Sequence, residues 1–305
     1  MRVKSIMALF LCVTLLLSSC VEATLNYRSL RDGQSDSAGN DAKVWTEDDT
    51  KKLAHAAYRQ VADSLRFAPD KDARYSIDFY TTVITESEEN YTSQDGYLAV
   101  VSEGGVEQLL YHNQIFSEIS GREEYLLLDI EYDGKRLFYA RDDMGSYIEL
   151  LLGSRGVLFL DVDHYDESRP RSEVPTDMDT LLGELRERVV ETVSLPSFQL
   201  ESVKEAERFD PYGYEFYLTV DGSALRDYVW EVAGEVVKGA GGRRSDMTIH
   251  DVYIELEIND LGYMEYLSID TSVDVNNSEG TTSIIIQAEF WATAHGPDIE
   301  IEVSY

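Results

Sequence analysis

The stretch DVYIELEINDLGYMEYLSIDTSVDVN, residues 251–276, decides the fold class of this chain. Apolar side chains occupy every second position in 252–258, and charged or aromatic side chains fill the positions between them. After the turn DLG at 260–262, the alternation resumes and continues to residue 275. Successive side chains of a strand point to opposite faces, so this hairpin has one apolar and one polar face. It predicts an antiparallel sheet with one face in water and one face that another layer must cover.

The same two-residue period runs through most of the remaining sequence. Residues 74–163 predict a meander of five to seven antiparallel strands, in which Asp133-Gly134 predicts a type I′ hairpin turn. Further strands are expected at 198–209, 212–222, 281–294 and 298–305.

Three segments with a helical period supply the cover. They are residues 46–66, 176–193 and 223–242. Apolar residues recur every three or four positions in each of them. Thr46 with Asp49, and Thr176 with Asp179, match the capping box that begins a helix. We therefore expect the α+β class, with one large curved antiparallel sheet and about three helices packed on its concave face.

The composition excludes several classes of partner. The chain carries 26 Lys and Arg against 58 Asp and Glu, a net charge of −32. Such a charge repels nucleic acid, because nucleic-acid binding needs basic patches, and it also repels anionic lipid surfaces. It suits a solvated monomer outside the cell. Because 43% of the residues are apolar and 20 are tyrosine, the chain can still bury a core.

The start of the chain has the pattern of an export signal. Arg2 and Lys4 precede an apolar run at 5–17. This run is shorter than the ~20 residues that a membrane-spanning helix needs, and it ends in small residues. It therefore predicts a signal peptide and not a membrane span.

The motif Leu17-Ser18-Ser19-Cys20 closes this signal. It resembles the lipobox of bacterial lipoproteins. The resemblance implies that the sulfur of Cys20 receives a diacylglyceryl group and that the signal is cut just before it. The alternative is a plain signal with an incidental cysteine. Cys12 leaves with the signal, so we expect no disulfide in the mature chain.

Lipidation at this position sets the expected organisation of the chain. Two acyl chains anchor a protein stably, at ~0.8 kcal/mol per buried CH₂. We expect a signal peptide at 1–19, a lipidated flexible tether at 20–44 and a single domain at 45–305, lipid-anchored on the extracytoplasmic face of the cell membrane. Residues 45–175 and 176–305 each run from a helix into strands, which is a weak internal repeat.

Three stretches of the second half carry a further resemblance. Residues 214–221 read YEFYLTVD and lead into Ala224-Leu225, 251–256 read DVYIEL, and 297–301 read PDIEI. With the lipobox, these motifs resemble the LolA/LppX-like group of envelope lipoproteins, in a branch found mostly in Gram-positive bacteria. The first half resembles this group only in layout. The resemblance implies a half-barrel, and the wider group includes carriers and binders of lipids or lipoproteins.

Motifs of catalysis and metal binding are missing from the sequence. It has no H-E-x-x-H, no G-x-S-x-G, no P-loop and no C-x-x-C. The histidines are scattered: His55, His112, His164, His250 and His295. We therefore expect no enzyme, no catalytic residue, no cofactor and no metal site. The acidic stretch DVDHYDE at 161–167 offers oxygen ligands but lacks the loop glycine and distal glutamate of an EF-hand, so we interpret it as a solvated edge.

Two functions are compatible with these patterns. The first is a non-enzymatic lipoprotein that binds an apolar or amphiphilic ligand, lipid-like or lipoprotein-like, in the half-barrel; the residues that would bind it are unknown. The second is an anchored scaffold or sensor whose polar sheet face contacts an envelope protein or a wall polymer. Exposed tyrosines of the strands would serve the second function, although aromatic residues also favour strands for packing alone.

Overall fold

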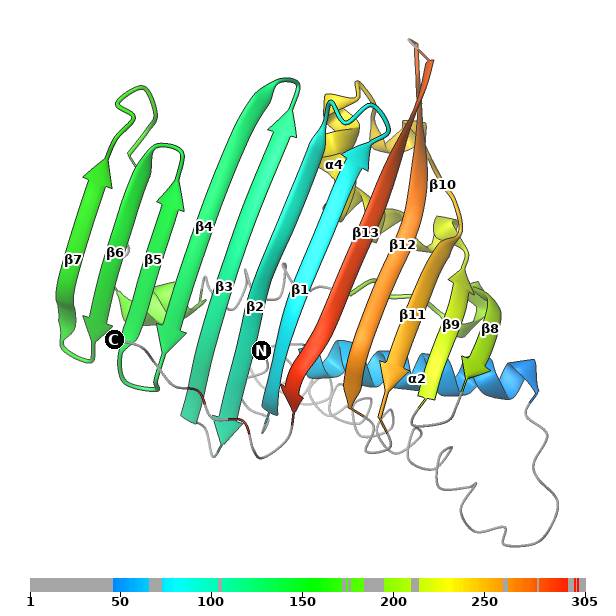
Figure 1. The fold of residues 1–305 in the computed structure, drawn as a ribbon, viewed down its shortest axis with the longest axis horizontal. Coiled ribbons are helices and arrows are strands. Elements are labelled where there is room, and N and C mark those ends of the chain that lie inside the picture. Colours follow the sequence, from blue (N-terminus) through cyan, green and yellow to red (C-terminus); the bar gives the residue numbers. More distant parts are fainter. Residues whose placement is uncertain are drawn as a thin grey trace, which may run out of the picture.

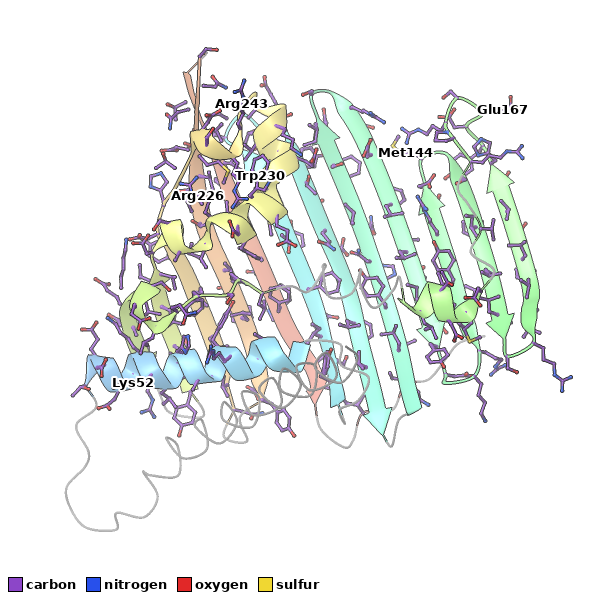
Figure 2. The ribbon with its side chains drawn as sticks, turned by 180° about the vertical axis from the view of Figure 1, so that it is seen from behind. Lys52, Met144, Glu167, Arg226, Trp230 and Arg243 are labelled. Atoms are coloured by element: carbon purple, nitrogen blue, oxygen red, sulfur yellow. The ribbon has the colours of Figure 1, made fainter. Side chains whose placement is uncertain are left out.

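One antiparallel sheet of 13 strands carries the fold, and the helices lie on a single face of it (Figures 1 and 2). The computed structural model describes residues 46–65, 73–103, 106–171, 174, 177–183, 195–209, 214–259, 263–278, 280–295, 299 and 301. The strand order is β7-β6-β5-β4-β3-β2-β1-β13-β12-β11-β9-β8, with β10 paired to β12. The sheet is curved and unclosed, and its pairings are antiparallel. The expected fold class is confirmed.

The elements follow the chain in this order. The first strands are β1 (Ala73–Thr85), β2 (Tyr91–Glu103), β3 (Val106–Ile119), β4 (Arg122–Tyr132), β5 (Leu137–Asp143), β6 (Ser146–Gly153) and β7 (Gly156–His164). The later strands are β8 (Val203–Phe209), β9 (Tyr214–Val220), β10 (Met247–Ile249), β11 (Val252–Ile258), β12 (Met264–Asn277) and β13 (Gly280–His295). The helical elements are α2 (Glu47–Leu65), α4 (Arg226–Gly239), the short η1 (Leu200–Ser202), η2 (Gly222–Leu225) and η3 (Arg244–Asp246), and residues 178–183.

Two meanders meet at the centre of the sheet. Strands β1 to β7 cross it in chain order, as predicted for the first half, and β13 to β8 occupy the other side (Figure 1). Pairing of β1 with β13 joins them, with Phe79 opposite Phe290. The segments 45–175 and 176–305 therefore contribute adjacent parts of one sheet.

Helix α2 begins where the sequence predicts. The backbone N–H of Asp49 donates to Thr46 Oγ1 at 3.2 Å, and the N–H of Thr46 donates to Asp49 Oδ2 at 3.3 Å. This is the reciprocal capping box, which satisfies two N–H groups that the first turn would leave unpaired. One turn later, Leu53, Ala54 and Ala57 are fully buried and join the main core.

The second helix is capped by a different residue from the one predicted. Asp177 Oδ2 accepts a hydrogen bond from the backbone N–H of Thr180 at 2.8 Å. Asp177 is therefore the N-cap in place of the predicted pair of Thr176 and Asp179, and Thr176 itself lies outside the described residues. A carboxylate at this position also interacts favourably with the positive end of the helix dipole. The described part of this helix is 178–183, and the predicted remainder to 193 lies outside the described residues.

The core fills the sheet face that the helices cover, which we call the inner face. The predicted alternation is confirmed, because the apolar residues of β11 are buried while the residues between them are exposed or partly exposed. These buried residues are Val252, Ile254, Leu256 and Ile258. Helix α2 packs over one end of the strands and α4 over the other (Figure 2). Val229 and Val237 of α4 contribute to a second core cluster with Ile284 and Ile286 of β13.

The turn between β4 and β5 is wider than the predicted type I′ turn. It occupies 133–136, and Gly134 has a φ of 87° while Asp133 does not take a positive φ. A type I′ turn needs positive φ at both central residues. Asp133 Oδ1 instead accepts hydrogen bonds from the backbone N–H groups of Lys135 at 2.8 Å and Arg136 at 2.7 Å. The side chain of Asp133 thus organises a four-residue loop.

Of the strand expected at 298–305, the structure describes Ile299 and Ile301, and the rest of this prediction lies outside the described residues. Ile299 and Ile301 are outside any strand, and both are buried with Ala99 and Val101 of β2. These two β2 residues lie on the outer face, which is the sheet face opposite the helices. Strand β2 already has a partner on each side, so a segment that reaches it can pack across the strands but cannot pair with them.

Candidate functional site on the outer face

The outer face of β9, β11, β12 and β13 carries exposed aromatic and acidic side chains. We call this surface the aromatic–acidic face and define it by Tyr217, Tyr253, Tyr266, Trp291, Glu215, Glu255, Glu257, Asp270 and Glu289. Tyr253 is 59% exposed, Tyr217 40% and Trp291 39%. Each of these side chains alternates along its strand with a core residue, so the period that builds the core also builds this surface.

Two adjoining hollows mark this surface. One has a volume of about 670 Å³ and is lined by Lys204, Asp221, Ile249, His250, Asp251, Tyr253, Asp270, Thr271, Ser272 and Ile285. The other has a volume of about 330 Å³ and is lined by Glu205, Glu207, Tyr217, Leu218, Thr219, Tyr253, Ile254, Glu255, Ser268 and Asp270. Tyr253 and Asp270 line both hollows, so the exposed ring of Tyr253 lies between the two hollows.

The aromatic rings are held by neighbours on the same face. Tyr266 and Trp291 are cross-strand partners, and their ring centroids lie 5.8 Å apart. The ring of Tyr217 meets Phe209 of β8 edge to face, with the centroids 5.4 Å apart. The Tyr266 hydroxyl donates to Glu289 Oε1 at 3.2 Å. These contacts fix the rings before any partner arrives, which lowers the entropy lost on binding.

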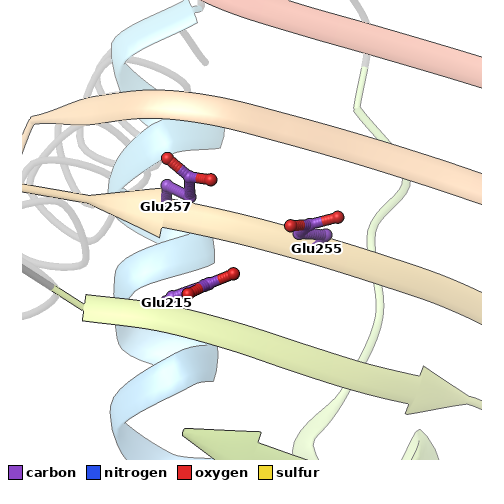
Figure 3. Close-up of side chains that lie close together, drawn as sticks. All are labelled: Glu215, Glu255 and Glu257. Atoms are coloured by element: carbon purple, nitrogen blue, oxygen red, sulfur yellow. The ribbon is translucent and has the colours of Figure 1, made fainter. Parts of the chain in front are cut away.

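Three carboxylates gather on β9 and β11, next to Tyr217, and Figure 3 shows the three side chains. One oxygen each of Glu215, Glu255 and Glu257 lies within 4.8 Å of the other two. Glu215 and Glu257 are direct cross-strand partners of β9 and β11. The Tyr217 hydroxyl donates to Glu215, and to Glu255 Oε1 at 3.1 Å. One phenol therefore bridges two of the three acids.

The crowding of these acids raises the pKa of one of them and that of the neighbouring tyrosine. Burial, followed by the negative charges of Glu215, Glu255 and Glu265, raises the pKa of Glu257. The hydrogen bond to Glu215 raises the pKa of Tyr217 well above its usual range, so Tyr217 stays a neutral donor. The surface thus combines five acidic side chains, Glu215, Glu255, Glu257, Asp270 and Glu289, with exposed aromatic rings.

The chemistry of this surface favours a cationic partner. Lysine and arginine side chains pair with carboxylates and also stack on tyrosine and tryptophan rings. An anionic polymer would instead meet repulsion. The three glutamates offer oxygen donors of the kind that hard cations take, but a group of partly exposed acids does not by itself define a metal site.

The predicted lipobox residues Leu17, Ser18, Ser19 and Cys20 lie outside the described residues. Lipidation of Cys20 therefore stays a prediction from the sequence. Within the residues that are described, we find no helix that combines the length and the apolar character of a membrane span.

The acidic stretch 161–167 lies along β7 and the turn that follows. Asp161 and Asp163 are exposed on the strand, while Asp166 Oδ1 accepts a hydrogen bond from the backbone N–H of Ser168 at 2.9 Å. Hydrogen bonds from Ser168 lower the pKa of Asp166. The position of Asp161 and Asp163 on an edge strand agrees with the interpretation of this stretch as a solvated edge.

The aromatic–acidic face was not recognised from the sequence as a site. Among 58 acidic residues, a pair such as Glu255 and Glu257 carries no information on its own. The cluster forms because β9 pairs with β11, which brings Glu215 beside Glu255 and Glu257. In the sequence, helix α4 lies between these two strands. The usable signal was the run of tyrosines and acids on the polar positions of both strands.

Comparisons with known proteins add no family. No family model matches the chain, and no curated protein matches it. The solved structures that resemble it include the dehydratase domain from the CurK module of curacin polyketide synthase, at 10% identity, 80% of this chain, 83% of that chain and a TM-score of 0.13. An inactive mutant of the CurK dehydratase has 9% identity, 81% and 83% coverage and a TM-score of 0.13. Such scores carry no argument about fold or function, and the LolA/LppX-like resemblance stays a prediction.

Proposed function

We propose that this chain is a non-enzymatic, lipid-anchored protein of the extracytoplasmic face whose aromatic–acidic face binds a basic surface of another envelope protein. The observation that carries the proposal is the hollowed outer surface around Tyr253, where fixed aromatic rings stand among carboxylates. Aromatic side chains that are rigid and partly exposed are typical anchors of protein interfaces. The charge of the surface selects a cationic partner over an anionic wall polymer.

The test is cross-linking of the full chain in its own membranes. A photoreactive residue at position 253 is expected to give a discrete adduct, and the double variant Glu255→Gln with Glu257→Gln is expected to reduce its yield several-fold. The matched control places the photoreactive residue at position 231, an exposed site on α4. The same adduct from both positions, or an adduct that survives neutralisation of the two acids, contradicts the proposal.

The anchor has its own test, because the outer face can bind a partner with or without lipid. Cys20→Ala is expected to move the chain from the membrane fraction to the soluble fraction, since two acyl chains supply the membrane affinity. Ser19→Ala keeps a small residue before the cysteine and serves as the control. Unchanged membrane partitioning of Cys20→Ala would refute lipid anchoring.

A second candidate function is binding of an apolar or amphiphilic ligand between sheet and helices. The observation that favours it is the one-sided cover, with α2 and α4 over two separate apolar clusters of the inner face (Figure 2). Against it, large side chains such as Tyr111, Phe79 and Phe216 already fill the described core. Native mass spectrometry of the purified protein, followed by lipid extraction, decides the point. A co-purified lipid at a fixed ratio supports this candidate, and none from a folded sample counts against it.

A further inference from the structure

The edge strand β7 is exposed from residue 157 to residue 163 and carries a run of apolar side chains. The exposed fractions run from 44% to 59% for Val157, Leu158, Phe159, Leu160 and Val162. It forms one end of the sheet, so among the described residues no strand pairs with one side of its backbone (Figure 1). Soluble proteins avoid long apolar edge strands, since their free N–H and C=O groups pair with other chains. An edge of this kind therefore calls for a function.

The opposite edge of the same sheet is protected. Strand β8 reads VKEAERF, with charged residues at most positions, and its pairing with β9 is interrupted between Val203 and Glu205. Helix α2 also reaches this edge, because Lys51 Nζ donates to the carbonyl oxygen of Lys204 at 2.9 Å. Charge, irregular pairing and a covering helix are the usual protections of an edge strand. Strand β7 instead begins with an apolar run at 157–160, and its two acids follow at 161 and 163.

The inner side of β7 continues the apolar face of the sheet. Leu160 pairs with Leu150, and Val162 pairs with Ile148. The two β6 residues are almost fully buried, at 0% and 1% exposure, whereas their partners on β7 remain 44% exposed. An added strand would extend this apolar face by one row and bury both β7 side chains.

The strand is also held in place at both ends. Its first residue, Gly156, pairs with Gly153 across a tight turn and takes a φ of 108°. Just beyond its last residue, the N–H of Tyr165 donates to the carbonyl of Gly145 at 3.0 Å. A strand fixed in this way offers a preformed template, which lowers the entropy lost when a peptide pairs with it.

The outer side of β7 is acidic. Asp161 lies directly opposite Glu149 of β6, and Asp163 lies opposite Tyr147. Tyr147 donates to Glu149 Oε2 at 2.7 Å, which together with burial and nearby acids raises the pKa of Tyr147 to about 12. Like charges on facing strands oppose each other, so a cation placed beside Asp161 and Glu149 relieves their repulsion.

We propose that β7 accepts an extended strand of another protein in which lysine or arginine alternates with apolar residues. Main-chain hydrogen bonds supply the pairing, the apolar side chains cover Leu160 and Val162, and the basic side chains face Asp161 and Asp163. A second copy of this chain fits less well, because each chain has a net charge of −32 and brings the same acids to the edge. This surface lies at the far end of the sheet from the aromatic–acidic face, and the proposal does not depend on it.

Hydrogen exchange of the full chain tests this directly. The probe is a synthetic seven-residue peptide of alternating Lys and Val. Its controls are the Glu and Val counterpart and a peptide of the same Lys and Val in two blocks. We expect the alternating basic peptide to slow exchange of the amides at 157–163 and to leave the β8 amides unchanged. The variant Asp161→Lys with Asp163→Lys is expected to weaken binding of this peptide about tenfold and to favour binding of the acidic counterpart. Leu160→Thr keeps a strand-forming residue, and is expected to weaken binding of both the basic and the acidic alternating peptide.

Several outcomes would overturn the proposal. Protection by the blocked peptide equal to that by the alternating one reveals general attraction to an acidic protein. Protection of β7 in the free chain, with a mass of twice the chain, reveals a second copy at this edge. The same protection in a monomer assigns the edge to another segment of this chain. Unchanged exchange with every peptide removes the site. A folded circular dichroism spectrum of each variant accompanies the measurement, so that loss of structure is not read as loss of binding.

Discussion

At the scale of single residues, Glu257 is a group that opposes folding when it is ionised. It faces Glu215 across β9 and β11, and its pKa is raised. A carboxyl with a raised pKa stabilises the fold below the pKa of unfolded glutamate, ~4.3, and this contribution is lost as pH rises through the folded value. At pH 7 the charge therefore costs stability. We expect Glu257→Gln to raise the free energy of unfolding at pH 7 by about 0.5 kcal/mol, after allowance for solvent screening.

Urea unfolding at pH 7 and at pH 4 measures this effect. The gain from Glu257→Gln is expected at pH 7 in low salt and should shrink both at pH 4 and in high salt. Glu231→Gln, an exposed change on α4, is the control. A gain of the same size at both pH values would mean that packing, and not charge, explains it.

Turn geometry shows which details at this scale escape the sequence. The dipeptide Asp133-Gly134 predicts a type I′ turn, yet the loop there is organised by the Asp133 side chain. Ser120-Gly121 has φ values of 54° and 73° and directly joins β3 to β4. These are the positive angles of a type I′ turn. The strands set the geometry of a turn through their twist and register, and dipeptide preference is the weaker influence.

At the scale of elements, Gly96 sets how closely β1, β2 and β3 approach. It lies opposite Phe79, and a Cβ added to it would come 2.5 Å from the Phe79 ring and 2.3 Å from the carbonyl oxygen of His112. The second contact is with backbone, so a side-chain movement cannot relieve it. We expect Gly96→Ala to lower the free energy of unfolding by about 1–3 kcal/mol, measured by urea denaturation.

Gly183 is the matched control for this substitution. It lies in the helical segment 178–183, and a Cβ there would meet no atom of the described residues within 4 Å. Gly183→Ala is expected to leave stability unchanged or to raise it by up to about 1 kcal/mol, because alanine favours helix. Equal losses from both substitutions would show that the close approach at Gly96 is not the cause.

Helix α2 contacts the segment 195–199 through the side chains of His55 and Tyr58, and the Tyr58 hydroxyl is buried in this contact. Tyr58 donates to the carbonyl oxygen of Pro196 at 2.9 Å, and its ring centroid lies 4.6 Å from that of Phe198. Tyr58→Phe keeps the ring contact and leaves a buried carbonyl without its donor. We expect a loss of about 1–2 kcal/mol in thermal or urea unfolding. Tyr80→Phe, at an exposed tyrosine, should change little, and a loss as large as that of Tyr58→Phe would argue against the hydrogen bond.

Strand pairing explains why the fold class was predictable and the candidate site was not. The alternation in 252–258 is local, and it correctly assigned Val252 and Leu256 to the core. The neighbour of each strand is decided by contacts distant in sequence, such as Leu256 with Phe216 and Phe79 with Phe290. The aromatic–acidic face consists of side chains from four such strands. It therefore becomes visible only once the pairing is known.

At the scale of the whole molecule, the pairing of β1 with β13 joins the strands of 45–175 and 176–305 into one sheet. Both strands lie in the interior of the sheet, with partners on each side. The main core cluster likewise contains Ile77 and Leu98 from the first half with Leu218 and Leu267 from the second. The similar order of elements in 45–175 and 176–305 is thus compatible with a single continuous sheet, and the weak repeat in the sequence does not divide it.

The net charge of −32 places a second constraint on the whole molecule. Even if every basic side chain formed an ion pair, many carboxylates would repel one another in the folded state, and exposed ion pairs are worth only ~0–1 kcal/mol each. Salt shortens the screening length from ~30 Å at 0.01 M to ~8 Å at 0.15 M. We therefore expect the melting temperature at pH 7 to rise with sodium chloride over this range. The rise should shrink near pH 4.3, the pI of the sequence, because the net charge approaches zero there.

A fall in melting temperature at pH 7 would mean that ion pairs such as Arg141 with Asp143, 3.0 Å apart, outweigh the repulsion. A rise of equal size at both pH values would mean that salt acts through general exclusion from the surface.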